Sequence, residues 1–332
     1  MTGQVPPPTE ARAPDNRAFI EEGASLGRGI SVGVFPPAQI SQGPKEVLGE
    51  YLRSVEEAGV DYICCGDHVS FWVGFGSDGL LTAASYAALT RRLPVAIGVY
   101  LLVLRHPVLV ARQISTFESL FPGRLILGVG IGGEDRHEVE ICGVDPSSRG
   151  RRMDECLEIL RELLTGKPVS YSGRFFQIEN ALVLPNPKQQ VPILIGGRSD
   201  AAVRRAARYG EGWLPIWVSA QRFRTATTRI AELAEATGRD PSSMTHGLQV
   251  WCSVDSNRQR ARDRLAAAME ALYRIPFERF EKWCPYGDVA EVAEFLRPYA
   301  EAGCKYFHLT LQAADPDAQI EAAAEIKRAL AG

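Results

Sequence analysis

The sequence has neither the charge excess nor the cysteine spacing that mark several classes of protein. Its formal net charge is -3 over 332 residues, whereas proteins that bind nucleic-acid backbones usually carry a strong basic excess. None of its seven cysteines lies in a C-x-x-C pair, which indicates reduced thiols rather than a metal or redox site. We therefore expect no nucleic-acid partner, no bound metal and a reducing, cytoplasmic environment.

Long apolar segments are also missing. No run approaches the roughly 20 apolar residues of a membrane span, so we expect no membrane partner. The N-terminal segment contains prolines and acidic residues, and it lacks the apolar stretch of a secretory signal peptide. We expect residues 1–27 to form a disordered or surface-bound extension, and residues 28–332 to form one domain, because no clear linker divides them.

Short apolar runs alternate with longer amphipathic stretches through the rest of the chain. Seven of the eight runs are nearly continuous, which is typical of strands covered on both faces. Eight such strands alternating with helices favour an α/β fold of the (β/α)8 TIM-barrel type, which needs about 250 residues. The expected strands cover residues 29–35, 62–66, 94–103, 125–132, 191–195, 212–217, 246–254 and 306–311.

Two connections are too long for a simple barrel and indicate insertions. We expect two short strands within residues 166–190, and an additional helix over residues 257–273 within the connection 255–305. Aromatic residues in these two connections favour an apolar mouth for a substrate site, although they could equally be packing residues.

The second expected strand ends in a candidate proton-transfer site. Asp67 and His68 follow the strand directly, and Trp72 comes four residues after the histidine. In a barrel, functional groups gather at the carboxyl ends of the strands. A histidine there can exchange a proton near neutral pH, and a tryptophan can stack on a planar ligand. The alternative is a capping aspartate beside packed aromatic rings.

The fourth expected strand runs into a glycine-rich segment, Gly128–Gly133. Four glycines in six residues would let the main chain approach a flat ligand without an intervening side chain. The spacing does not match the dinucleotide-binding fingerprint. The charged segment Glu134–Glu138 that follows has no histidine pair with metal-ligand spacing, so we expect a solvated loop with one active carboxylate.

The fifth expected strand leads into Gly196, Gly197, Arg198 and Ser199. A glycine turn into a helix start exposes main-chain N–H groups, and the helix dipole favours an anion there. This segment could therefore bind a phosphate, and it could equally be an ordinary turn between a strand and a helix.

Several segments together resemble the luciferase-like monooxygenase superfamily and, within it, the coenzyme F420-dependent oxidoreductases. The similarity covers roughly residues 30 to 312. The segments that carry it are Cys65–His68, Leu104–Gln113, Phe121–Gly130 and Pro192–Gly197.

The resemblance implies roles for several side chains. His68 would face the reacting carbon as proton donor or anion stabiliser, with Trp72 behind it. The family also has a catalytic glutamate directly after the glycine block. Here Gly133 occupies that position and Glu134 comes one residue later, so the glutamate's role passes to Glu134 only as a hypothesis.

The resemblance also implies the cofactor site. It predicts a non-prolyl cis peptide bond in the third strand, at Tyr100–Leu101, which would support the ring, and a phosphate site at the fifth strand. The predicted cofactor contacts are Asp67, Tyr100, Leu101, Ile131, Gly132, Gly133, Gly196, Gly197, Arg198 and Ser199.

The sequence therefore predicts an F420-dependent oxidoreductase that transfers a hydride between the deazaflavin and a small organic substrate. By the same resemblance we expect a homodimer. One alternative is an FMN-dependent monooxygenase of the same fold, supplied with reduced flavin by a partner reductase. Another is a flavin- or F420-binding protein without turnover. The identity of the substrate does not follow from the sequence.

Overall fold

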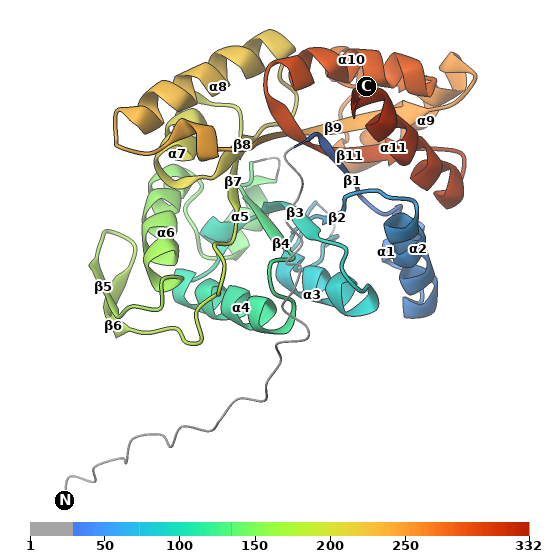
Figure 1. Ribbon diagram of the computed structural model, residues 1–332. Coiled ribbons are helices and arrows are strands. Elements are labelled where there is room, and N and C mark those ends of the chain that lie inside the picture. The colour runs from blue at the N-terminus through green and yellow to red at the C-terminus, as the bar shows by residue number, and fades with distance from the viewer. Residues whose placement is uncertain (1–28, 73, 134, 332) are drawn as a thin grey trace, which may run out of the picture.

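The computed structural model describes residues 29–72, 74–133 and 135–331, and its central feature is a barrel of parallel strands (Figure 1). Neighbouring strands follow the order of the chain, and the last one pairs with the first. The barrel strands are β1 (Ser31–Val34), β2 (Tyr62–Cys65), β3 (Val95–Tyr100), β4 (Leu125–Val129), β7 (Ile193–Gly196), β8 (Gly212–Leu214), β9 (His246–Val254) and β11 (Cys304–Gln312).

The barrel closes between β8 and β9. A parallel bridge joins Ile216 to Gln249, and the main-chain N–H of Gln249 donates to the carbonyl of Pro215 at 3.0 Å. The short strand β10 (Tyr286–Gly287) extends the sheet beside the end of β9.

Helices cover the outside of the barrel (Figure 1). Eight of them alternate with the barrel strands: α2 (Lys45–Glu57), α3 (Gly79–Leu89), α4 (Pro107–Leu120), α6 (Arg149–Leu163), α7 (Asp200–Tyr209), α8 (Ala220–Glu235), α10 (Val289–Glu301) and α11 (Pro316–Ala331). The shorter or inserted elements are α1 (Ala38–Ser41), α5 (Arg136–Ile141), α9 (Arg258–Tyr273), the hairpin β5 (Val169–Ser172) and β6 (Gln177–Ala181), and the 3-10 turns η2 (Leu102–Leu104), η3 (Pro241–Ser243), η4 (Phe277–Arg279) and η5 (Glu281–Trp283).

The barrel strands are apolar on both faces because each face meets a different core. On β2, Tyr62 and Cys64 point into the barrel, where they form one cluster with side chains of β3, β4, β7 and β8. Ile63 and Cys65 belong to the larger cluster between the strands and the helices. This two-sided burial explains why the apolar runs in the sequence are continuous rather than alternating.

The predicted barrel with insertions is confirmed. The hairpin β5–β6 occupies the first long connection, and α9 occupies the second within one residue of its expected start. The sixth expected strand is shorter than predicted, because β8 ends at Leu214 and Trp217 adopts a left-handed conformation with φ of 55°. The predicted N-terminal extension, residues 1–27, lies outside the described residues.

The predicted position of the non-prolyl cis peptide bond is wrong. The bond lies at Gly98–Val99 and not at Tyr100–Leu101. Pairing between β3 and β4 is irregular between Ile97 and Tyr100, and Tyr100 is already back in register opposite Val129. The irregular part of β3 therefore ends before the bond that the resemblance indicated.

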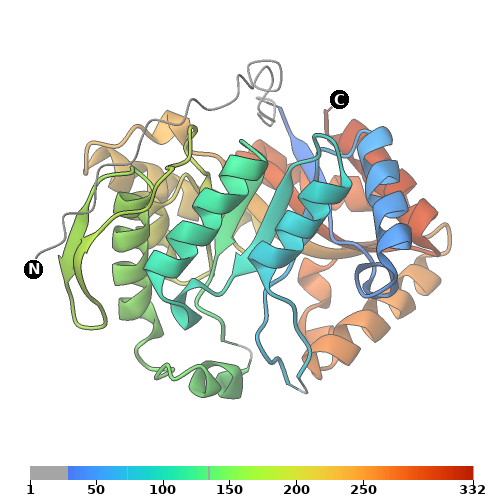
Figure 2. The same ribbon diagram turned by 90° about the horizontal axis from the view of Figure 1, so that it is seen from below.

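The loop after β2, helix α5 and helix α9 project from the same end of the barrel, at the bottom of Figure 2. This is the end at which the parallel strands finish, and therefore the end at which a barrel of this type carries its functional groups.

Candidate active site

A cavity of about 670 Å³ opens at the carboxyl end of the barrel. It borders the ends of β1, β2, β9 and β11, and it extends to the last turn of α9. Three residues predicted from the second strand, Asp67, His68 and Trp72, line it. Its size, and the aromatic side chains in its wall, are those of a small-molecule site.

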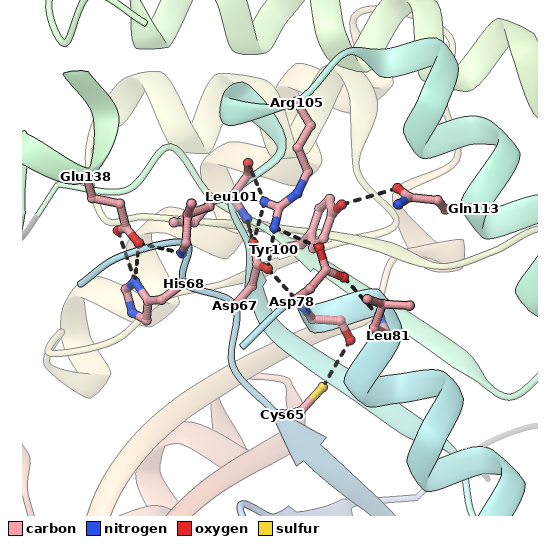
Figure 3. A network of polar contacts seen from close by, with 12 residues as sticks. Cys65, Asp67, His68, Asp78, Leu81, Tyr100, Leu101, Arg105, Gln113 and Glu138 are labelled. Carbon is pink, nitrogen blue, oxygen red and sulfur yellow. Dashed lines mark hydrogen bonds and ion pairs between the residues drawn. The ribbon is translucent and has the colours of Figure 1, made fainter. Parts of the chain in front are cut away.

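His68 is paired with a buried glutamate (Figure 3). Its Nδ1 lies 3.0 Å from Oε2 of Glu138 and 3.2 Å from Oε1. The glutamate Oε1 also accepts from the main-chain N–H groups of Val69 at 2.7 Å and Ser70 at 3.0 Å. Burial acts to raise the pKa of Glu138, but the hydrogen bonds from His68, Ser70 and Val69 outweigh it and hold that pKa below its ordinary value. Glu138 is therefore an ionised acceptor.

An ionised acceptor at Nδ1 fixes the orientation of the His68 ring. The Nδ1 atom must donate to Glu138, which leaves Nε2 as the nitrogen available for proton exchange. None of the described residues forms a hydrogen bond with Nε2. The ring packs against Phe71 at a centroid distance of 4.2 Å, and its side chain retains 28% exposure beside the cavity.

Asp67 holds the loops around His68 together (Figure 3). Its carboxylate accepts two hydrogen bonds from Arg105, at 2.7 and 2.8 Å, and one each from the main-chain N–H groups of Gly79 and Leu101. Burial raises the pKa of Asp67, and these four donors oppose that effect. The carboxylate oxygens of Asp67 are thus already hydrogen-bonded to protein groups. The cofactor contact predicted for Asp67 would have to come from its main chain.

Trp72 forms part of the rim of the cavity. Its main-chain φ is 49°, in the left-handed region, and its main-chain N–H donates to Asp135 Oδ2 at 2.6 Å. The indole is 38% exposed and lies 5.1 Å from the ring of Phe71. A tryptophan held in this uncommon conformation presents a flat apolar face at the mouth of the site.

The inner end of the cavity is polar but uncharged. A Cβ atom built on Gly98 would lie 3.3 Å from Oε1 of Gln249 and 3.5 Å from Nδ1 of His308. Burial lowers the pKa of His308 to about 3, so its ring is neutral at neutral pH. Gly98 and Gln249 both line the cavity, whereas Tyr100 and Leu101 are buried and lie outside its lining.

Three of the glycines at the strand ends have a packing role. Cβ atoms at Gly130 and Gly196 would crowd the side chain of Val99, and one at Gly128 would overlap the carbonyl of Ile97. These positions therefore accommodate the irregular segment of β3. In contrast, Gly132 and Gly133 have φ values of 66° and 159° and no atom nearer than 3.6 Å to a built Cβ. Among these five glycines, only Gly132 and Gly133 have the uncovered main chain that the sequence suggested for a ligand.

Two features near the starts of α6 and α7 favour an anion. Ser199 caps α7 by accepting from the main-chain N–H of Ala202 at 3.2 Å. At the first residue of α6, Nη1 of Arg149 is buried without a hydrogen-bond partner among the described residues, and it lies 3.6 Å from the Cβ position of Gly133. Helix starts favour negative charge, and an unpaired buried guanidinium nitrogen is costly unless an acceptor reaches it.

Of the predicted residues that the structure describes, only Asp67, His68 and Trp72 line the His68 cavity, and Tyr100 and Leu101 are buried. Ile131, Gly132 and Gly133 and the turn from Gly196 to Ser199 lie outside the lining of the His68 cavity. An aromatic cluster containing Trp217, Trp251 and Phe280 covers the ends of β8 and β9, and Arg198 lies 5.5 Å above the Trp217 ring. Glu134 lies outside the described residues.

Sequence reasoning missed the partner of His68. Glu138 appeared only as one member of a charged segment, and the contact joins residues 70 positions apart. Asp135 gives a partial signal, because its side chain caps α5 and so places Glu138 in the first turn of a helix. Arg274 and Trp251 were also missed, although both line the cavity.

Comparison with known proteins gives consistent matches. Residues 30–306 match the family described as luciferase-like monooxygenase. The F420-dependent glucose-6-phosphate dehydrogenase of Nakamurella multipartita is 28% identical over 305 residues, which cover 83% of this chain and 89% of that protein.

Solved structures show the same fold. An F420-dependent secondary alcohol dehydrogenase, solved with an F420-acetone adduct, superposes with a TM-score of 0.80 at 21% identity, covering 91% of this chain and 99% of that one. The oxygenating constituent of 3,6-diketocamphane monooxygenase from Pseudomonas putida, solved with FMN, gives a TM-score of 0.72 at 17% identity, covering 91% and 98%. Within the described residues, no helix is long and apolar enough to span a membrane.

Proposed function

Because the chain belongs to the luciferase-like monooxygenase family, we propose that it is an oxidoreductase that uses coenzyme F420 and transfers a hydride between the deazaflavin and a small organic substrate. The observation that carries the proposal is the His68–Glu138 pair beside a cavity at the barrel mouth. The similarity to an F420-dependent dehydrogenase over most of both chains supports this choice of cofactor.

The residues present fit such a cofactor in two places. The cavity beside His68 has flat aromatic walls and an uncharged inner end, which suits a planar ring. The starts of α6 and α7, with the unpartnered Nη1 of Arg149 and the open main chain at Gly132 and Gly133, suit a phosphate. Gly197, with φ of 95°, and Ser199 would complete the phosphate site.

When bound, F420 supplies a two-electron hydride acceptor or donor. The contribution of the protein is then one proton and a defined orientation. In the oxidising direction, Nε2 of His68 accepts the proton of a substrate hydroxyl, and in the reducing direction it returns that proton. Glu138 keeps Nδ1 protonated in both directions and offsets the positive charge of the ring when Nε2 is protonated.

Aromatic side chains border the imidazole of His68. Phe71 packs on the ring of His68, and Trp72 covers the rim beside it. A bound ligand that displaces water from this cavity would strengthen the electrostatic pairing of His68 with Glu138 and would limit proton exchange with solvent.

An FMN-dependent monooxygenase is the second candidate, since an FMN-bound oxygenase shares the fold. Equilibrium titration of the purified protein with F420 and with FMN, followed by difference spectra, separates the two. We expect saturable binding of F420 with much weaker binding of FMN. Tight FMN binding without F420 binding, together with oxygen consumption when reduced FMN is supplied, would favour the monooxygenase. F420 binding without turnover of any substrate would favour a binding protein.

A further inference from the structure

The cavity beside His68 has an aromatic wall and few charged groups. The aromatic residues that line it are Phe35, Phe71, Trp72, Phe75, Tyr86, Trp251 and Tyr273. The charged or titratable acidic and basic residues in its lining are Asp67, His68, Arg274 and Asp315.

Both carboxylates in this lining already have partners. Asp67 is paired with Arg105, and Asp315 lies before α11, where it accepts from the N–H of Ala318 at 2.8 Å. Arg274 is therefore the permanent cation in the lining that remains available to a ligand.

Arg274 is placed at the rim by its main chain. It ends α9 in a left-handed conformation, with φ of 54°, and its N–H donates to the carbonyl of Glu270 at 2.9 Å. The guanidinium lies 6.0 Å from the centre of the Trp72 ring. Within residues 29–72, 74–133 and 135–331, no acidic side chain forms an ion pair with it. A guanidinium that lies over an indole at this distance keeps its N–H edges free for a planar acceptor.

The charge of this cavity does not suit a phosphorylated sugar. A phosphate monoester carries up to two negative charges at neutral pH. One rim arginine provides too little positive charge for a phosphate, and the other polar side chains in the lining, such as Gln249 and Thr310, are uncharged. A carboxylate, in contrast, matches one guanidinium in both charge and geometry.

We infer that the substrate of this chain is a largely apolar molecule bearing a single carboxylate, that Arg274 binds this carboxylate at the rim, and that the apolar body lies along the aromatic wall toward His68. The inference rests on the proposed function and specifies its substrate class. It differs from the substrate named for the matched dehydrogenase, glucose 6-phosphate.

The test compares charged and neutral versions of the same apolar probe on the full-length protein. Phenylalkanoates of increasing chain length and the matching phenylalkanamides are titrated against the protein, with tryptophan fluorescence and calorimetry as readouts. We expect the best carboxylate to bind about tenfold tighter than its amide, as a charge-assisted hydrogen bond provides. Glucose 6-phosphate should neither bind in the cavity nor reduce bound F420.

Two substitutions assign the preference to one side chain. In Arg274→Gln, the carboxylate should fall to the affinity of its amide while the amide itself binds as before. Arg274→Lys keeps the charge without the planar fork, and should retain part of the preference. Arg279→Gln is the matched control, because Arg279 lies on η4, is exposed and is absent from the cavity lining. It should leave all affinities unchanged. Circular dichroism checks that each variant is folded.

Several outcomes would overturn the inference. These are equal affinity for carboxylate and amide, no binding of either probe series, an undiminished preference in Arg274→Gln, or reduction of F420 by glucose 6-phosphate. A loss of F420 affinity in Arg274→Gln would assign the arginine to the cofactor and would also overturn it, with the proposed function intact. Absence of F420 binding by the unmodified protein would instead contradict the proposed function, whatever the probes do.

Discussion

The Nδ1 atom of His68 lies 3.0 Å from Oε2 of Glu138, and the glutamate is buried. This pair joins the loop after β2 to helix α5 and leaves Nε2 of the imidazole as the nitrogen that can exchange a proton at the cavity. The proposed reaction depends on this orientation, because hydride removal from a carbinol carbon needs a proton acceptor beside it, and hydride addition to a carbonyl carbon needs a proton donor there.

Replacing Glu138 should change how stability depends on pH. The folded-state pKa of Glu138 is below its ordinary value of 4.5, so the ionised carboxylate stabilises the fold above that pH. This stabilisation is lost as pH falls from 4.5 through the lowered folded-state pKa. Urea unfolding at a series of acidic pH values should therefore show a smaller loss of stability in Glu138→Gln than in the unmodified protein. An identical pH dependence in both proteins would contradict the ionised pair.

Replacing His68 should abolish proton transfer without removing the cofactor site. We expect His68→Asn to lower kcat by about a hundredfold to ten-thousandfold, the usual contribution of a general acid or base. The dissociation constant for F420 should change little. Steady-state assays of F420 absorbance, with any substrate that the unmodified protein turns over, check both statements. A variant with unchanged kcat would remove His68 from the mechanism.

Adding a methyl group at Gly130 should destabilise the barrel. A Cβ atom there would overlap Val99, and overpacking of this kind costs about 1–3 kcal/mol. In the double variant Gly130→Ala with Val99→Ala, much of that loss should be recovered, because the smaller side chain makes room. Gly66→Ala is the control, since a Cβ atom there meets no atom within 4 Å. Chemical denaturation of the variants measures the free energies, and a fully stable Gly130→Ala would disprove the packing role.

Breaking the Asp67–Arg105 pair should lower the stability of the folded protein. Both side chains are largely buried, and removing one member of a buried ion pair costs about 3–5 kcal/mol. We expect Arg105→Met to lower the midpoint of urea unfolding strongly. Arg53→Met, on the outer helix α2, should have little effect, because no described acidic residue pairs with Arg53. Similar midpoints for the two variants would show that Asp67 tolerates the loss of its partner.

The barrel could be predicted from the sequence because two-sided burial leaves a continuous apolar run at each strand. The ends of the strands could not be predicted equally well. Trp217 continues an apolar run in the sequence, yet its left-handed conformation places it after the strand. The irregular segment of β3 was placed too late in the chain, because the sequence does not show where pairing with β4 is interrupted.

The candidate site was predictable only where residues close together in the sequence form it. Asp67, His68 and Trp72 line the cavity as their spacing suggested. The Glu138 contact depends on how α5 folds back over the β2 loop, which local sequence does not encode. Glycines that a ligand would require and glycines that Val99 requires look identical in sequence, and only the packing around them distinguishes the two. The expected homodimer stays a prediction, which light scattering of the purified protein would test.

The central claim is that an imidazole held by Glu138 lies beside a bound deazaflavin. It is tested most directly by the absorption difference spectrum of F420 bound to the unmodified protein and to His68→Asn. We expect both proteins to bind F420 with similar affinity and to give different spectra, because the chromophore senses the side chain next to it. Identical spectra, or no binding of F420 by the unmodified protein, would contradict the claim.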